Sequence, residues 1–172
     1  KRTVEGDLGT YLNAGPLARL IGHGVLEREL GVDPAPLLAD WPPIPHTDSQ
    51  QALAARLARE AGSLAVRRHA GSLREVFPPE GRRRYAQGKD LTEAGTLIAT
   101  GGALTRLEGR RGVLAALRDL NTSGRMLYPK PGALRVLSDR RYLMAALGVL
   151  SREHPQAALH MLLDSLAEET LS

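Results

Sequence analysis

A glycine-containing stretch in the middle of the chain carries the residues best suited to contact a ligand: Thr96-Leu97-Ile98-Ala99-Thr100-Gly101-Gly102-Ala103-Leu104. Residues 96–99 are predicted to form a short strand covered on both faces, followed by the start of a helix. Gly101 and Gly102 place no Cβ atom at the end of this strand, so a phosphate or a nucleoside could approach the main chain. The first N–H groups of the helix would point to the same place. An ordinary strand–turn–helix connection has the same composition, so both interpretations stay open here.

Acidic residues next to predicted loops are the second group of candidates. The segment Glu5-Gly6-Asp7-Leu8-Gly9 could be a loop that faces a ligand, or a turn in which Asp7 accepts backbone N–H bonds at a helix start. Asp7, Asp90 and Asp139 could contact Mg²⁺ directly or through water, but none has a second carboxylate at a spacing that specifies a metal. The five histidines show no HxxxH or HExxH spacing and the chain has no cysteine, which excludes thiolate sites and argues against zinc.

Basic residues are numerous, and the formal net charge is +4. Arg67, Arg68 and His69 end a predicted helix, where positive charge complements the helix dipole. A nucleic-acid-binding domain that uses Arg82–Arg84 and Arg110-Arg111 is one alternative function. The basic residues form several short clusters rather than one stripe, which is more typical of a solvated surface.

Length and composition favour one soluble globular domain or a piece of a larger one: the chain has 172 residues, of which 42% are hydrophobic and 24% charged. With one Trp, four Tyr and one Phe, the core must be built from Leu, Ala, Val and Ile. No apolar run approaches the ~20 residues of a membrane span and no signal peptide is visible, so we expect a cytoplasmic protein. The start at Lys1 without an initiating Met suggests an excised fragment.

Periodicity and turn residues predict the elements that position these candidates. Thr47-Asp48-Ser49-Gln50 has the form of a capping box that opens a helix to about Ala70. A loose hairpin is predicted from residues 73–77 and 82–86. Strands at 96–99 and 133–137, separated by a helix over 113–120, predict a parallel βαβ unit with Gly101 and Gly102 at the carboxyl end of the sheet, where ligands bind.

The last third of the chain is predicted to be helical. Ser138-Asp139 would cap a long helical segment, and Pro155 would start a final helix. The predicted buried face of the first comprises Tyr142, Ala145, Ala146, Leu147, Val149 and Leu150. The predicted inward residues of the second are Ala158, Leu159, Leu162 and Leu166. Upstream, short helices are predicted between Asn13 and Leu38, followed by a proline-rich loop over 40–46 that Trp41 pins to the body.

Several of these motifs together resemble one family. In order they are Lys1-Arg2-Thr3-Val4-Glu5-Gly6-Asp7-Leu8-Gly9, Arg68-His69-Ala70-Gly71, Gly88-Lys89-Asp90-Leu91-Thr92, Ile98-Ala99-Thr100-Gly101-Gly102-Ala103-Leu104, Leu127-Tyr128-Pro129-Lys130 and residues 139–150. They resemble the carboxyl-terminal part of the methylaspartate (glutamate) mutase accessory proteins of the MutL type, which are unrelated to the mismatch-repair proteins of the same name. Each motif alone is weak, and the resemblance depends on their number and order.

The resemblance implies a fold and a set of site residues. The family is similar to actin-like (ribonuclease H-like) ATPases, so we expect an α/β, helix-rich fragment of the second lobe with a few short strands. Residues 40–92 would be a helical and hairpin subdomain, and 93–172 the nucleotide-side βα segment with closing helices. Nucleotide-binding residues would be Thr100, Gly101, Gly102, Ala103, Gly6 and Asp7. Family-like positions without an assigned role are Arg68, His69, Lys89 and Asp90.

The chain departs from the family pattern because both phosphate loops are missing. We expect them, and the catalytic residues that depend on them, upstream of Lys1. The resemblance therefore implies ATP and Mg²⁺ as cofactors of a full-length protein that could be an ATPase, with this fragment inactive alone. Its partners would be adenosylcobalamin-dependent mutase subunits, without nucleic acid or membrane, and it could form a homo-oligomer. The alternatives are a helical protein-interaction module without nucleotide binding and the basic nucleic-acid-binding domain.

Overall fold

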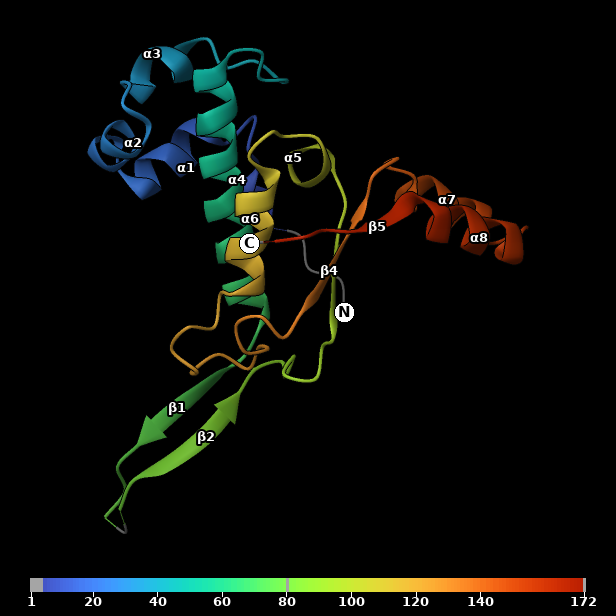
Figure 1. Ribbon diagram of the computed structural model, residues 1–172. Coiled ribbons are helices and arrows are strands. Elements are labelled where there is room, and N and C mark those ends of the chain that lie inside the picture. Colours follow the sequence, from blue (N-terminus) through green and yellow to red (C-terminus); the bar gives the residue numbers. More distant parts are fainter. Residues whose placement is uncertain (1–4, 80, 172) are drawn as a thin grey trace.

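The computed structural model describes residues 5–79 and 81–171, which form a helical body with a three-stranded sheet beside it and a two-stranded hairpin that projects away from the helices (Figure 1). The part of the resemblance that falls on residues 1–4 lies outside the described residues. The elements are the 3₁₀ helix η1 (Gly6–Leu8), α1 (Ala14–Ile21), α2 (His23–Leu30), α3 (Pro34–Ala39), α4 (Asp48–His69), β1 (Ser72–Val76), β2 (Arg83–Gln87), β3 (Thr96–Ala99), α5 (Gly102–Thr105), α6 (Arg110–Arg118), β4 (Arg135–Asp139), α7 (Met144–Leu150), α8 (Pro155–Ser165) and β5 (Leu166–Glu168). The mixed α/β class is confirmed, while the actin-like lobe and its division near residue 92 stay predictions.

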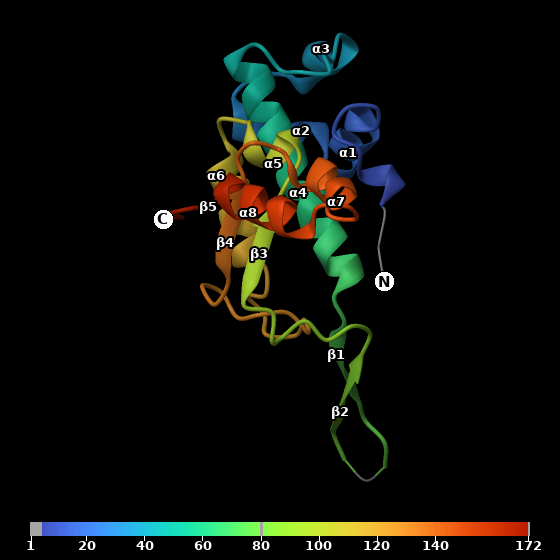
Figure 2. The ribbon, with the colours of Figure 1, turned by 90° about the vertical axis from the view of Figure 1, so that its right-hand side faces the viewer.

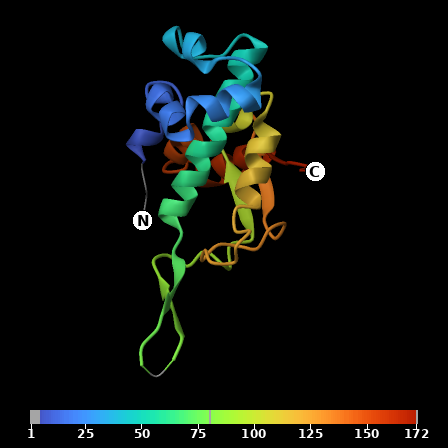
Figure 3. The same ribbon diagram turned by 90° about the vertical axis from the view of Figure 1, so that its left-hand side faces the viewer.

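Helix α4 is the longest element and the centre of the core. Its predicted capping box is present: the Thr47 hydroxyl accepts from the Gln50 N–H, and the Gln50 side chain accepts from the Thr47 N–H. One face of α4 packs Leu53 and Leu57 against residues of α1 and α2. Figure 3 shows α4 from the side of these small helices. A second face packs Ala54 and Ala58 toward α5 and α6. The predicted loop anchor is also confirmed, because Trp41 Nε1 donates to the Thr10 carbonyl at 3.1 Å.

A three-stranded sheet in the order β3-β4-β5 lies beside α6. Strands β3 and β4 are parallel and joined through α5 and α6, which confirms the predicted βαβ unit. The second strand spans 135–139 rather than 133–137. The prediction that β3 is covered on both faces is wrong. Side chains alternate along a strand, so Leu97 and Ala99 face the core while Ile98 is 45% exposed on the other face.

The predicted hairpin is confirmed as β1 and β2, which pair antiparallel and project away from the helices (Figures 1 and 2). Its base is a close crossing of two main chains. The Gly71 N–H donates to the Lys89 carbonyl and the Gly71 carbonyl accepts from the Leu127 N–H, both at 2.7 Å. A Cβ on Gly71 would lie 2.5 Å from the Gln87 carbonyl oxygen, so this position requires glycine. We call β1, β2 and their connecting turn the hairpin arm.

The predicted length of the last long helical segment is wrong, although the Asp139 carboxylate does accept from the Leu143 and Met144 N–H groups at the start of α7. Ser138 and Asp139 end β4, and α7 has seven residues with Leu143 at its N-cap. Of its predicted buried face, Leu147 alone is buried; Leu150 is half-buried and Tyr142, Ala145, Ala146 and Val149 are exposed. In α8, Ala158 is buried and Leu162 half-buried, Leu159 is 53% exposed, and Leu166 has passed into β5. Helices α7 and α8 pack on each other beside the sheet, so much of their apolar surface has no neighbour (Figure 1).

None of the helices among residues 5–79 and 81–171 combines the length and apolar character needed to cross a membrane.

Candidate functional site at the carboxyl end of the parallel strands

The turn after β3 keeps its main chain accessible. Gly101 has φ +94°, a conformation that side chains rarely adopt, and it is the N-cap of α5. Its carbonyl accepts from the Leu104 N–H at 3.1 Å and from the Thr105 hydroxyl at 2.8 Å. A Cβ built on Gly101 or on Gly102 would meet no atom within 4 Å. The packing of the protein therefore does not explain two glycines here.

A cavity of about 500 Å³ opens beside this turn. It is lined by Thr10, Tyr11, residues 41–45, Gln51, Ala54, Gly102, Ala103, Arg106, Leu107 and Tyr142. The indole and prolines form one wall and the first turn of α5 another, so the cavity is suited to a flat, largely apolar group. Gln51 Nε2 donates to the Pro45 carbonyl at 2.9 Å, but the buried Oε1 has no partner among the described residues.

Asp139, at the end of β4, holds together the segments next to the glycine turn. The Thr100 hydroxyl donates to its carboxylate at 3.1 Å, and the Leu143 and Met144 N–H groups donate at 3.1 and 2.8 Å. The Ser165 hydroxyl also donates to it, which ties α8 to the strand end. Asp139 is fully buried, and burial alone raises the pKa of its carboxyl. The hydrogen bonds outweigh burial and lower the pKa below the usual value, so the group is ionised at neutral pH.

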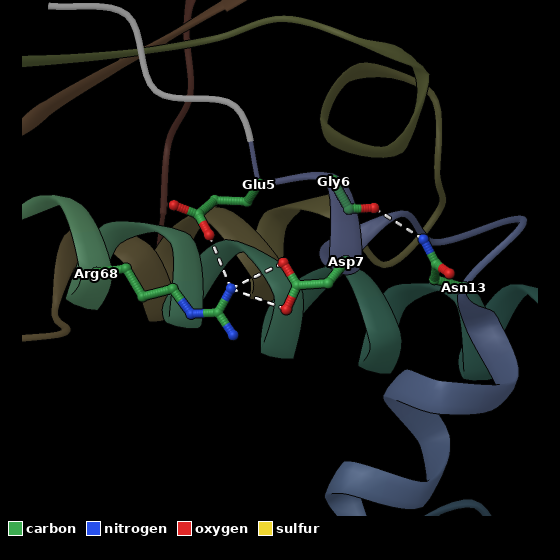
Figure 4. Close-up of polar contacts among 5 residues, drawn as sticks. All are labelled: Glu5, Gly6, Asp7, Asn13 and Arg68. Carbon is green, nitrogen blue, oxygen red and sulfur yellow. Dashed lines mark hydrogen bonds and ion pairs between the residues drawn. The ribbon is translucent and has the colours of Figure 1, made fainter.

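The amino-terminal candidates form a separate cluster (Figure 4). Arg68 donates from one nitrogen to Glu5 at 2.7 Å and to both carboxylate oxygens of Asp7 at 2.9 Å. These two carboxylates raise the pKa of the Arg68 guanidinium, so it remains charged. The Gly6 carbonyl accepts from Asn13 Nδ2 at 2.8 Å. Asp7 is therefore an ion-pair partner here rather than a helix cap, and its role toward a nucleotide stays a prediction.

His69, Lys89 and Asp90 lie at the base of the hairpin arm. Lys89 Nζ and His69 Nε2 are 3.0 Å apart, and Asp90 accepts from the side chain and the N–H of Thr92. These two bonds lower the pKa of the Asp90 carboxyl. The family-like positions 88–92 thus build a tight turn beside Gly71, which gives them a structural reason to be present.

The structure places the predicted site residues in two groups. Gly102 and Ala103 line the cavity with Ala54 of α4, whereas Arg68 lies fourteen residues later on the same helix. At 1.5 Å per residue this separation is about 21 Å along the helix axis. Thr100 to Ala103 are therefore together at one end of β3, while Arg68, His69, Lys89 and Asp90 gather at the other end of α4.

Sequence reasoning assigned Asp139 to a helix cap but missed its contact with Thr100. It also missed Trp41 and Tyr142 as walls of the cavity. Asp139 ends the strand parallel to β3, and the carboxyl ends of adjacent parallel strands meet at one edge. Had the second strand been extended by two residues, this rule would have placed Asp139 beside Thr100. Among the described residues, no group of three or more His, Cys, Asp or Glu is arranged to hold a metal ion.

Comparison with known proteins gives a consistent result along the chain. The profile of the family described as "MutL protein" matches residues 1–166. "Protein MutL" from Clostridium tetanomorphum is 27% identical over 170 residues, which cover 94% of this chain and 36% of that relative. The chain thus spans about a third of the length of the curated relative that it matches. No solved structure matches it.

Proposed function

The chain belongs to the MutL protein family, and from this premise we propose that it is the nucleoside-contacting, carboxyl-terminal part of an ATP-binding accessory protein. The protein would reactivate an adenosylcobalamin-dependent mutase of the glutamate mutase type. The observation that carries the nucleotide part of the proposal is the cavity beside Gly101 and Gly102, where the space that a Cβ would fill is open.

The cavity fits a nucleoside in shape and chemistry. The first turn of α5, with Gly102 and Ala103, offers bare main chain on which a purine could lie, and Trp41 and Tyr142 offer aromatic surface. The orphaned Gln51 Oε1 would gain a partner from an amino group of a bound heterocycle after a small rotation of its amide. The Thr100–Asp139 bond holds the chain in place directly before the turn at Gly101 and Gly102.

Hydrolysis of a phosphoanhydride bond of ATP, bound with Mg²⁺, would supply the free energy for reactivation. The residues of this chain bind and orient the nucleoside, and the difference in affinity between open and closed lobes would couple nucleotide state to affinity for the mutase. The Glu5, Asp7 and Arg68 cluster is satisfied internally in this structure. Gly6 and Asp7 would act on the nucleotide only after Arg68 releases the Asp7 carboxylate.

The test is a titration of the full-length protein with ATP, comparing the unaltered protein with Gly102→Val. Gly102 does not have a positive φ, so valine fills the cavity mouth without the backbone strain expected at Gly101. We expect ATP affinity to fall about tenfold or more, because bulk replaces the bare main chain. Isothermal titration calorimetry gives the affinity, and circular dichroism checks the fold.

Gly24→Val is the matched control. Gly24 also lies in the first turn of a helix, is exposed, and has no atom within 4 Å of a built Cβ, but it lines no part of the cavity. ATP affinity should be unchanged in this variant. Equal ATP affinity in Gly102→Val and in the unaltered protein would contradict the proposal that the nucleoside binds in this cavity.

A second function, protein interaction without a nucleotide, is favoured by the hairpin arm, which is exposed along all of β2. Binding of the mutase that is equally tight with and without ATP would favour this interaction module over a nucleotide-dependent one.

A further inference from the structure

The hairpin arm is a two-stranded ribbon that extends beyond the body of the protein (Figures 1–3). All five residues of β2 are exposed, and those of β1 alternate between exposed and half-buried. Isolated two-stranded hairpins are marginally stable in water, so an exposed ribbon of this kind needs either an internal anchor or a partner surface.

The register of the strands divides the arm into two faces. Glu75 lies opposite Arg84, and Leu73 opposite Ala86, on an inner face that borders residues 123–125. Arg74 lies opposite Tyr85, and Val76 opposite Arg83, on the outer face. The Glu75 carboxylate accepts from Arg84 Nε at 3.0 Å and also from Arg82, so the inner face supplies its own counter-charges.

The outer face combines guanidinium groups with apolar surface. Its Tyr85 is 50% exposed and its Val76 41%, and Phe77 after β1 is 75% exposed. Glu75, the acidic residue in the described part of the two strands, lies on the inner face, whereas Arg74 and Arg83 lie on the outer face. In the sequence, residues 72–87 contain four arginines and two glutamates. The arm therefore has a positive net charge, and its chemistry is complementary to an acidic surface.

This composition favours a protein partner over a nucleic acid. Tyr, Phe and Arg are the residue types enriched in protein interfaces and their energetic centres. A nucleic-acid ribbon depends on many phosphate contacts, about 6–10 in tight complexes, whereas the outer face offers two arginines beside a valine and a tyrosine.

The base of the arm is built to hold it in one direction. Gly71 and Gly88 cross so closely that a Cβ on Gly88 would lie 2.8 Å from the Gly71 Cα. Asn121 donates to the Met126 and Tyr128 carbonyls and accepts from the Met126 N–H, which fixes the neighbouring loop. The Leu73 N–H then donates to the Arg125 carbonyl at 2.8 Å. A fixed base lowers the entropy lost when the arm docks on a partner.

We propose that the outer face of the hairpin arm, with Arg74, Val76, Arg83 and Tyr85, docks on an acidic protein surface of the mutase. The identity of the partner depends on the proposed function, whereas the acidic chemistry of the contact follows from the arm.

The test measures binding of full-length protein to purified glutamate mutase subunits by biolayer interferometry. The variants are Arg74→Glu, which reverses an exposed charge, and Tyr85→Ala, which removes the opposite aromatic ring. Each should weaken binding about tenfold or more. Raising the salt concentration should weaken binding of the unaltered protein, because salt screens the attraction between Arg74 and the acidic surface. It should have less effect on Arg74→Glu, which has already lost that attraction. Arg28→Glu, the same change at an exposed position on α2, is the matched control and should bind normally.

Three results would overturn the proposal. If Arg74→Glu and Tyr85→Ala bind the mutase as tightly as Arg28→Glu does, the arm is not part of the interface. That result would not contradict the proposed function. Loss of duplex DNA or RNA binding in Arg74→Glu, with mutase binding intact, would assign the arm to nucleic acid. ATP affinity, measured on the same proteins, tests nucleotide binding at the cavity separately from docking of the arm, because the arm variants should bind ATP normally. Absence of mutase binding by the unaltered protein would refute the mutase as partner, and with it both proposals about the mutase, whatever the ATP result.

Discussion

The base of the hairpin arm and the carboxyl end of β3 each contain two glycines, and the reasons differ. At the arm base, a Cβ on Gly71 would lie 2.5 to 2.8 Å from three neighbouring atoms, two of them in the main chain. At the strand end, a Cβ on Gly101 or Gly102 would meet nothing within 4 Å. The first pair is required by packing. At the second, backbone conformation explains Gly101 but not Gly102, which borders an open cavity.

The polar anchors of the two regions also differ. At the arm base, Asn121 is a neutral amide that satisfies three backbone groups of one loop. At the strand end, Asp139 is an ionised carboxylate that accepts from Thr100, which follows β3, and from residues of α7 and α8. The Asn121 anchor is therefore expected to be indifferent to pH, whereas the anchor at the strand end depends on the charge of the Asp139 carboxylate. A glycine motif thus indicates a ligand site only when the space beside it is open.

The largest effect is expected from Gly71→Ala. The added methyl group cannot be accommodated without moving the main chain at Gln87 and Gly88 or the Leu127 side chain, so we expect the free energy of unfolding to fall by about 3 kcal/mol. Urea unfolding followed by circular dichroism measures it. Gly24→Ala is the matched control, because Gly24 has open space around a built Cβ and no positive φ. Its free energy of unfolding should be nearly unchanged. A loss below about 0.5 kcal/mol in Gly71→Ala would contradict the packing argument.

The second effect concerns the charge of Asp139. In Asp139→Asn the amide keeps one acceptor oxygen and turns an NH₂ group toward donors, so at pH 7 we expect a loss of about 2 kcal/mol. The folded-state pKa of Asp139 lies below its ordinary value. The stability that its ionisation contributes is therefore complete above the unfolded pKa of about 3.9 and is lost as pH falls through the lower folded pKa.

Unfolding at a series of pH values compares Asp139→Asn with the unaltered protein. The difference in unfolding free energy should be constant from neutral pH to about pH 4 and should shrink below it. Asn121→Ala, at the other region, should lose stability by an amount that does not change over the same range. A constant difference for Asp139→Asn down to the acid limit of folding would show that the carboxylate is not the anchor of the strand end.

The elements that local patterns control could be predicted from the sequence. The Thr47–Gln50 capping box predicts the start of α4, and the turn residues between the two strand segments predict the hairpin. Prediction fails at α7: the apolar stripe with Leu147 and Val149 predicts a buried face, but Val149 is 70% exposed. Periodicity identifies a stripe but does not say whether a neighbour covers it.

The candidate site was predictable in part for the same reason. Thr100, Gly101 and Gly102 are contiguous, so their shared place at a strand end could be predicted from the sequence. The cavity is formed by segments as distant as Tyr11, Trp41 and Tyr142, and no pattern in a single sequence brings these together. Asp139 is an intermediate case. Its contact with Thr100 was predictable in principle, but the predicted strand ends at residue 137, two residues before the observed end at Asp139.

The smallest expected effect is that of Gly102→Ala, the same chemical change as Gly71→Ala at the open site. Gly102 is the first residue of α5, its Cβ position is unobstructed, and alanine has the higher helix propensity, so the unfolding free energy should change by less than about 1 kcal/mol in either direction. The methyl group would occupy part of the cavity mouth, and ATP affinity should fall by about threefold, less than for valine. Urea unfolding and calorimetric titration of one preparation give both values. A stability loss as large as that of Gly71→Ala would mean that the strand end is packed like the arm base. The space beside Gly102 would then not be open to a ligand. A small stability change with lower ATP affinity is the combination that only an open, ligand-facing glycine produces.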